Sequence, residues 1–266
     1  MAKSVIFTMV GKGGVGKSTT SVWLHQFLVE KGLNVQGYDM DPDNATYDAF
    51  DGLNTQHIDV YNKRREIDKS LFDNLVENHL LQIPDNTVAI VDNGATNFNA
   101  LLTYMSENTL IDLLADHGIT TYISVPIAGG SEHYETLKGL VALHEEFNCP
   151  KIIWLNRYFG AMPEGDDEDP VTLLPQLLGD SLAALIDIPD YNADTFGKAI
   201  EEMQRKRKTF DEFYQDSDFG LMMRNRIKNF KATLWAELDG KLPFAADSGK
   251  GSRSKKTAEP EPEVAE

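Results

Sequence analysis

Residues 11–19 read GKGGVGKST and directly follow an apolar run, VIFTMV, at residues 5–10. The spacing is that of a phosphate-binding loop, in which glycines let successive backbone N–H groups point at phosphate oxygens. A strand should precede such a loop and a helix should follow it. Both are predicted here, because residues 19–31 carry apolar side chains at helical spacing and stop at Gly32.

The side chains at the end of this loop predict a nucleoside triphosphate and Mg²⁺ as ligands. Lys17 is expected to reach the β- and γ-phosphates, and Ser18 offers a hydroxyl to the metal. The helix that follows directs the positive end of its dipole at the anion. The residues expected to contact the nucleotide in this segment are Gly11, Gly13, Gly14, Val15, Gly16, Lys17, Ser18 and Thr19.

Composition favours one globular domain that stays in the cytosol. The chain has 266 residues, of which 41% are hydrophobic, and we expect a nucleotide-binding domain over residues 1–245. It contains neither a basic-then-apolar leader nor 18 consecutive apolar residues. Its single cysteine, Cys149, excludes an internal disulfide. The formal net charge of −17 repels DNA and anionic membranes, so either contact requires a local basic patch.

Apolar runs recur along the chain with helical stretches between them, which is the pattern of a buried parallel sheet. We therefore predict an α/β fold, a doubly wound three-layer sandwich with a mostly parallel sheet. In such sheets ligands bind beyond the carboxyl ends of the strands, so the residues that follow each strand should converge. The predicted strands are residues 5–10, 34–39, 87–92, 119–125, 151–156 and a shorter one near 185–188.

Carboxylates end two of these strands. Asp39 and Asp41 are two residues apart, and on an extended segment they face the same way, toward one Mg²⁺–water cluster. Asp-Pro also opens turns, so a turn or capping role is the alternative for this pair. Asp92 ends a hydrophobic strand, as does the Walker B aspartate that holds Mg²⁺ through water. Gly94, shortly after it, would let the backbone swing toward a γ-phosphate.

The C-terminal third is predicted to be mostly helical. A long helix over residues 220–238 interleaves basic side chains with apolar ones. Such a helix can lie on anionic lipid, contact DNA phosphates, or pack its apolar stripe on the sheet, and the last is the commonest arrangement. The acidic segment 164–169 is expected to be an exposed loop, and residues 246–266 a disordered tail with almost nothing to bury.

A second lysine in the loop, Lys12 within KGGVGKST, resembles the deviant Walker A loop of the ParA, MinD and nitrogenase-iron-protein group of ATPases. The resemblance implies ATP as the nucleotide and a dimer in which Lys12 contacts the phosphates bound by the partner subunit. It also implies that Asp41 positions the attacking water while Asp39 is a more distant Mg²⁺ partner, and that Asn156 and Arg157 contact the adenine. An asparagine that caps a turn is the alternative for Asn156. The Asn93-Gly94 pair departs from the proline-rich sequence that many relatives carry after the Walker B aspartate.

Longer stretches are similar to one branch of this group, the TraL-type conjugal transfer proteins of mobile plasmids. They span roughly residues 1–240 and include DPDNAT, VDNGA, WLNRYFG and MMRNRIK. The resemblance implies an accessory protein of plasmid conjugation that is cytosolic and acts near the inner membrane or with a partner in the transfer machinery.

The sequence is compatible with three candidate functions. The leading hypothesis is an Mg²⁺-ATP-driven dimer switch whose slow, partner-stimulated hydrolysis reopens the dimer. The second is a small-molecule ligase or kinase, since dethiobiotin-synthetase-like enzymes share the general loop. The third is a nucleotide-binding scaffold without turnover, against which the set Lys17, Ser18, Asp41 and Asp92 speaks.

Overall fold

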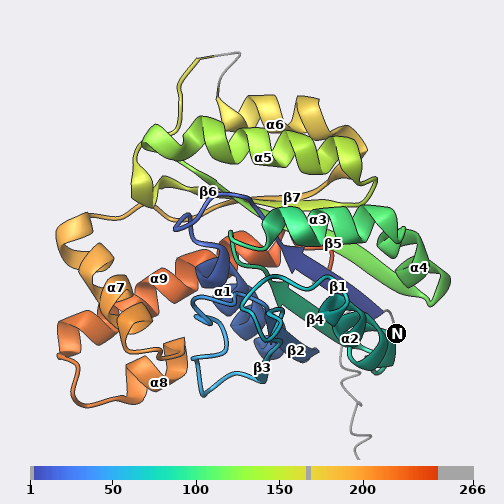
Figure 1. Ribbon diagram of the computed structural model, residues 1–266. Coiled ribbons are helices and arrows are strands. Elements are labelled where there is room, and N and C mark those ends of the chain that lie inside the picture. Colours follow the sequence, from blue (N-terminus) through green and yellow to red (C-terminus); the bar gives the residue numbers. More distant parts are fainter. Residues whose placement is uncertain (1–2, 166–168, 245–266) are drawn as a thin grey trace, which may run out of the picture.

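Seven strands, all paired in parallel, form one sheet in the order β3-β2-β4-β1-β5-β6-β7 (Figure 1). The structure is a computed structural model, and it describes residues 3–165 and 169–244. The strands are β1 (Lys3–Thr8), β2 (Asn34–Asp39), β3 (Thr55–His57), β4 (Thr87–Asp92), β5 (Ile119–Ala128), β6 (Lys151–Asn156) and β7 (Leu182–Asp187).

Helices cover both faces of the sheet, so the predicted three-layer α/β sandwich is confirmed. One face is covered by α2 (Leu71–Asn78), α3 (Phe98–Glu107), α4 (Leu110–Asp116), α5 (His133–Glu146) and α6 (Pro170–Leu178). The other face is covered by α1 (Lys17–Glu30) and α9 (Leu221–Asp239), and α7 (Lys198–Arg205) and α8 (Phe210–Gln215) pack against α9.

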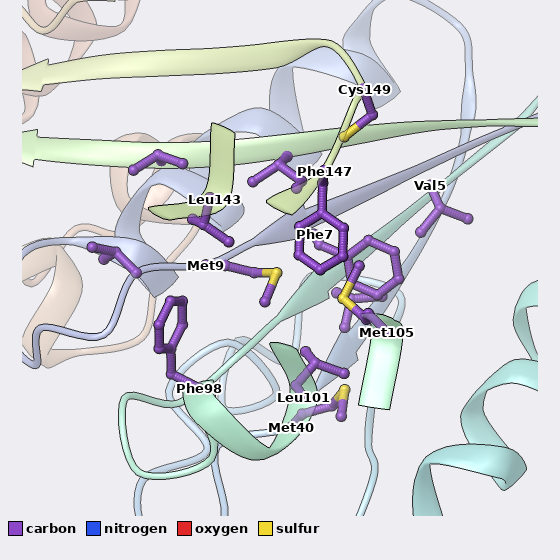
Figure 2. Packing of buried hydrophobic residues seen from close by; sticks show 14 of the residues in the cluster. Val5, Phe7, Met9, Met40, Phe98, Leu101, Met105, Leu143, Phe147 and Cys149 are labelled. Carbon is purple, nitrogen blue, oxygen red and sulfur yellow. The ribbon is translucent and has the colours of Figure 1, made fainter. Parts of the chain in front are cut away.

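The core lies on both sides of the central strands, because their side chains alternate between the two helical layers. On β1, Val5 and Phe7 join the cluster beneath α2–α6, whereas Ile6 joins the cluster beneath α1 and α9. Figure 2 shows Phe7 in this cluster together with Leu101 and Met105 of α3. Burial on two faces explains why these strands read as continuous apolar runs.

The observed strands differ from the predicted ones at the sheet edges and in two strands at its centre. β3 was not predicted, because it has three residues, Thr-Gln-His, that are half-buried or exposed at the edge of the sheet. β7 starts at Leu182, three residues before the predicted run, since only Ala184 and Ile186 of its six residues are buried. At the centre, β1 begins and ends two residues before the predicted 5–10, and β5 extends three residues beyond the predicted 119–125. β2, β4 and β6 have the predicted bounds.

The long C-terminal helix is confirmed as α9, and its apolar stripe packs on the domain. Ile227, Phe230, Leu234 and Leu238 are buried. The ring of Phe230 lies 5.2 Å from that of Trp23 on α1. Among residues 3–165 and 169–244, no helix is long and apolar enough to cross a bilayer. The predicted tail, 246–266, and the middle of the acidic segment, 166–168, lie outside the described residues.

Candidate functional site

The parallel register brings acidic side chains from two strands together at the carboxyl edge of the sheet. Asp92, at the end of β4, is paired with Thr8 of β1 on one side and with Asp39 of β2 on the other. The loop 9–16 leaves β1 at this edge and leads into α1. The convergence predicted for a doubly wound sheet is therefore present around the start of α1.

The loop depends on backbone conformations that favour glycine. Gly14 and Gly16 have φ angles of 75° and 101°, in the left-handed region. A Cβ placed on Gly16 would lie 2.8 Å from the Asn156 side-chain nitrogen, so space is limited there as well. The N-terminus of α1 has no side-chain cap, which leaves its first amide groups available to an anion.

Lys17 begins α1 and is almost completely buried. Its Nζ donates a hydrogen bond to the Lys12 carbonyl oxygen at 2.9 Å. Burial lowers the pKa of Lys17, and the negative charges of Asp92 and Asp41 act in the opposite direction. A desolvated ammonium beside a row of free amides is suited to a phosphate group, which would replace the lost water.

Asp92 has one carboxylate oxygen without a partner in the part of the chain that the structure describes. Only 1% of the residue is exposed, and Oδ1 accepts a hydrogen bond from Ser21 at 3.0 Å while Oδ2 is unpaired. Burial, followed by the charge of Asp39, raises the pKa of Asp92 to about 7, against the lowering effect of Ser18, Ser21 and Lys17. A buried, unmet carboxylate oxygen fits a metal-bound water.

The two aspartates after β2 occupy different environments. Asp39 is fully buried and uses both oxygens on backbone amides, Oδ1 on Asp41 and Oδ2 on Tyr47 and Asp48, at 2.8 to 3.0 Å. It therefore organises the loop that carries Asp41. Asp41 accepts two backbone hydrogen bonds on Oδ1, both at 3.0 Å, and lies in the wall of a cavity. The metal role of Asp39 and the water-positioning role of Asp41 stay predictions.

A cavity of about 1080 Å³ opens beside the loop. It is large enough for a nucleotide, since ligand pockets usually enclose roughly 300–1,000 Å³. The loop 11–19 and Asp41 border one part of it, and the loop after β7 with α7 borders another. Residues that line it include Gly13, Gly14, Lys17, Ser18, Thr19, Asp41, Asn156, Arg157, Pro189 and Tyr191.

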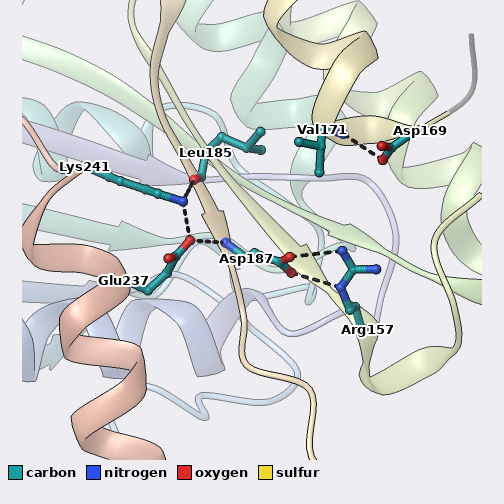
Figure 3. Close-up of polar contacts among 7 residues, drawn as sticks. All are labelled: Arg157, Asp169, Val171, Leu185, Asp187, Glu237 and Lys241. Carbon is teal, nitrogen blue, oxygen red and sulfur yellow. Dashed lines mark hydrogen bonds and ion pairs between the residues drawn. The ribbon is translucent and has the colours of Figure 1, made fainter. Parts of the chain in front are cut away.

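Asn156 and Arg157, the predicted adenine contacts, connect the ends of β6 and β7 to the loop. Asn156 donates from Nδ2 to the Val15 carbonyl at 3.1 Å. Arg157 makes two hydrogen bonds of 3.0 Å to Asp187, whose backbone N–H donates to Glu237 of α9 (Figure 3). Both side chains line the cavity. Their contact with an adenine base stays a prediction.

Lys12 contacts its own chain in this conformation. Its Nζ forms an ion pair with Glu132 at 2.5 Å, and the hydrogen bond and charge of Glu132 raise the pKa of Lys12. Glu132 ends the short 3-10 helix η2 (Gly130–Glu132) that precedes α5. The Lys12 side chain stays 41% exposed.

The arrangement fits Mg²⁺ only together with phosphate and water. Within residues 3–165 and 169–244, no three carboxylate, histidine or cysteine side chains gather closely enough to hold an ion. Mg²⁺ at nucleotide sites usually has few protein ligands and keeps several waters. The Ser18 hydroxyl and the free Oδ2 of Asp92 are the groups that would hold it here.

Two residues near the site were not predicted from the sequence. Asn97 donates from its side chain to the Met40 carbonyl at 2.9 Å, and Glu132 pairs with Lys12. Neither belongs to a motif, and each partner comes from a distant part of the chain. Only the position of Asn97, five residues after Asp92, could have suggested it.

Comparison with known proteins identifies the group. The family model of the CobQ/CobB/MinD/ParA nucleotide-binding domain matches residues 6–233. Two curated proteins named TraL from Escherichia coli are 33% and 31% identical over 242 residues, covering 90% of this chain and 98% of theirs. A solved ParA family ATPase from Chlorobium tepidum is 14% identical, with a TM-score of 0.49, covering 87% of this chain and 98% of that one.

The family match covers most of the chain, and the TraL relatives align along nearly their whole length. The geometry described above agrees with that assignment, since the glycine loop, Lys17 and Asp92 gather at one edge of a parallel sheet. This chain therefore belongs to the CobQ/CobB/MinD/ParA family of P-loop nucleotide-binding proteins and, within it, to the TraL type.

Proposed function

We propose that the protein is an Mg²⁺-dependent ATPase that closes as a homodimer when ATP binds and reopens after slow hydrolysis. The observation that carries this proposal is the Oδ2 of Asp92, which has no partner among the residues that the structure describes and lies near Lys17 at the carboxyl edge of the sheet. An unmet buried carboxylate costs stability, and it is compensated when a metal-bound water occupies the site.

In this proposal each group at the edge has one task. The free amides of the loop and the Lys17 ammonium bind the triphosphate, while Asp41 orients a water molecule and takes its proton. The water oxygen forms a bond to the γ-phosphorus as the bond to the β–γ bridging oxygen breaks. ADP leaves with that electron pair, and the proton passes on to the released phosphate. Mg²⁺, when bound, neutralises charge on the phosphate oxygens.

Lys12 would act on the nucleotide of the partner subunit. Its side chain is partly exposed, and its partner Glu132 is partly exposed as well. Exposed ion pairs contribute only about 0–1 kcal/mol, so exchanging Glu132 for a phosphate group costs little. The full charge on Lys12, which Glu132 keeps in place, would then offset charge on the transferred phosphoryl group.

The TraL relatives support an accessory role in conjugal plasmid transfer, with a protein of the transfer machinery as the partner that stimulates hydrolysis. Contact with membrane through the apolar stripe of α9 would require the helix to detach, since that stripe is buried. On the outer face, Lys231 is paired with Glu30 and Asp211. A protein partner is therefore favoured over lipid or DNA.

Size-exclusion chromatography with light scattering tests the dimer switch. With Mg²⁺-ATP, the slow-hydrolysing Asp41→Ala variant should elute as a dimer, and with ADP as a monomer. Adding Lys12→Ala to it should abolish the dimer. Adding Lys63→Ala, at an exposed lysine away from the cavity, should leave the dimer intact. Asp41→Ala that remains monomeric at every ATP concentration would contradict the proposal.

A further inference from the structure

Asn97 occupies the N-cap position of α3 but does not cap the helix. Its side chain accepts no hydrogen bond from the first turn of α3. An N-capping asparagine usually stabilises its helix by accepting a hydrogen bond from a backbone N–H of the first turn. Asn97 instead donates from Nδ2 to the carbonyl oxygen of Met40 at 2.9 Å. The side chain thus connects the start of α3 to the residue between Asp39 and Asp41.

The rest of the Asn97 amide is not satisfied. The residue is fully buried, and its Oδ1 has no hydrogen-bond partner within the described ranges. A buried acceptor without a partner is unfavourable, and an apolar side chain of the same shape would avoid that cost. Packing alone therefore does not account for an asparagine here. The donated hydrogen bond to Met40 is what distinguishes it from leucine.

Asn97 also lies next to the carboxyl group of Asp41. A Cβ placed on Gly94 would lie 2.8 Å from Asp41 Cγ and 3.1 Å from Asn97 Oδ1, so both side chains border the same point. A second bond joins the same two loops, because Thr96 donates to Asp43 at 2.9 Å. The loop after β4 and the loop after β2 are therefore coupled around Asp41.

We propose that Asn97 is a positioning residue for hydrolysis, and this rests on the proposed function of the site. By holding the Met40 carbonyl, it fixes the backbone that carries Asp41 and sets the carboxylate against Gly94. Movement of Gly94 toward a γ-phosphate would then be transmitted to Asp41. Asn97 itself contacts neither the nucleotide nor the attacking water.

Two near-isosteric substitutions test this role. Asn97→Leu removes the donor, and kcat for ATP hydrolysis should fall about 100-fold, the scale of a small misplacement of a reacting group. The Kd for ATP, measured by titration, should change less than about threefold, because the loop and Lys17 are untouched. Asn99→Leu, at an exposed position in the first turn of the same helix, is the matched control and should keep full activity.

Asn97→Asp adds a readout that a structural role would not move. At pH 8 the new carboxylate cannot donate to Met40, and kcat should fall as in Asn97→Leu. At pH 6 the fraction of that buried carboxyl that is protonated donates again, so kcat relative to the unsubstituted protein should rise about tenfold.

The outcomes separate the inference from the proposed function. If the unsubstituted protein hydrolyses ATP and Asn97→Leu keeps kcat within about threefold, the positioning role is refuted while the ATPase stands. If Asn97→Leu does not fold, Asn97→Asp at pH 8 decides the question in the same way, because its carboxylate cannot donate to the Met40 carbonyl: a kcat within about threefold of the unsubstituted protein refutes the positioning role. If the unsubstituted protein does not hydrolyse ATP, with or without candidate partners, the proposed function fails and the inference fails with it.

Discussion

The carboxyl edge of the sheet and the C-terminal helices differ in how deeply their charged side chains are buried. At the edge, Lys17, Asp39 and Asp92 are buried, and one oxygen of Asp92 is unpaired in the described part of the chain. Along α7 to α9, most charged side chains are at least partly exposed, and some form surface pairs such as Arg205 with Glu202. Buried charge that the fold does not satisfy indicates a ligand, whereas exposed paired charge indicates a solvated surface.

The largest difference between the two regions should appear in hydrolysis. Asp41→Ala is expected to lower kcat by about 10²–10⁴-fold, because the water loses the group that orients it and takes its proton. Its Kd for ATP should be nearly unchanged. Asp211→Ala, which removes an exposed carboxylate of α8, should leave both values intact. Phosphate release under saturating Mg²⁺-ATP measures the effect, and equal rates in the two variants would remove the distinction between the regions.

A substitution in the C-terminal helices should instead lower the stability of the fold and leave hydrolysis unchanged. Leu234→Ala in α9 removes a fully buried side chain and should lower the free energy of unfolding by about 2–5 kcal/mol. The kcat of the folded fraction should not change, since Leu234 does not line the cavity. Urea denaturation gives the free energy, with exposed Asn225→Ala in the same helix as the control. A loss under about 1 kcal/mol would mean that α9 is not an integral part of the core.

The pH dependence of stability tests the buried carboxylate at the edge. The folded-state pKa of Asp92 is raised to about 7, above its unfolded value, so the folded state binds more protons between pH 4 and 7. The free energy of unfolding without nucleotide should therefore fall as pH rises through this window, with a contribution of roughly 2–4 kcal/mol from Asp92. Asp92→Asn should remove that contribution. If the variant and the parent show the same slope in chemical denaturation, Asp92 is not protonated there.

Breaking ion pairs at the surface should give the smallest change in the free energy of unfolding. Lys231→Ala breaks two ion pairs, with Glu30 and Asp211, yet should lower the free energy of unfolding by less than about 1 kcal/mol. Thermal unfolding in low and high salt measures it, and the small difference from the parent should shrink as salt is added. A large loss of unfolding free energy that does not depend on salt would mean that these ion pairs behave like the buried charges at the carboxyl edge of the sheet.

The sequence predicted most of the fold because its signals are local. The loop 11–19, the central strands and the helix now seen as α9 each follow from spacing within one segment. The edge strand β3 was missed, since three polar residues leave no periodic pattern.

For the site, the sequence placed Lys17, Asp41 and Asp92 at one edge, because parallel strands end together. The family resemblance implied different roles for Asp39 and Asp41, but their spacing alone did not show that Asp39 is buried, since that depends on backbone amides contributed by residues 47 and 48. The ion pair Lys12–Glu132 and the hydrogen bond between Asn97 and Met40 join segments far apart in the chain, so no local sequence pattern predicts them.

The most direct test of the central claim is a calorimetric titration of ATP into the protein with Mg²⁺, compared with Lys17→Ala. We predict one binding site per chain and an affinity at least about 100-fold weaker in the variant, since the buried ammonium supplies a charge-assisted hydrogen bond to the phosphates. Equal affinities in the two proteins, or no binding to either, would contradict a nucleotide site at the start of α1.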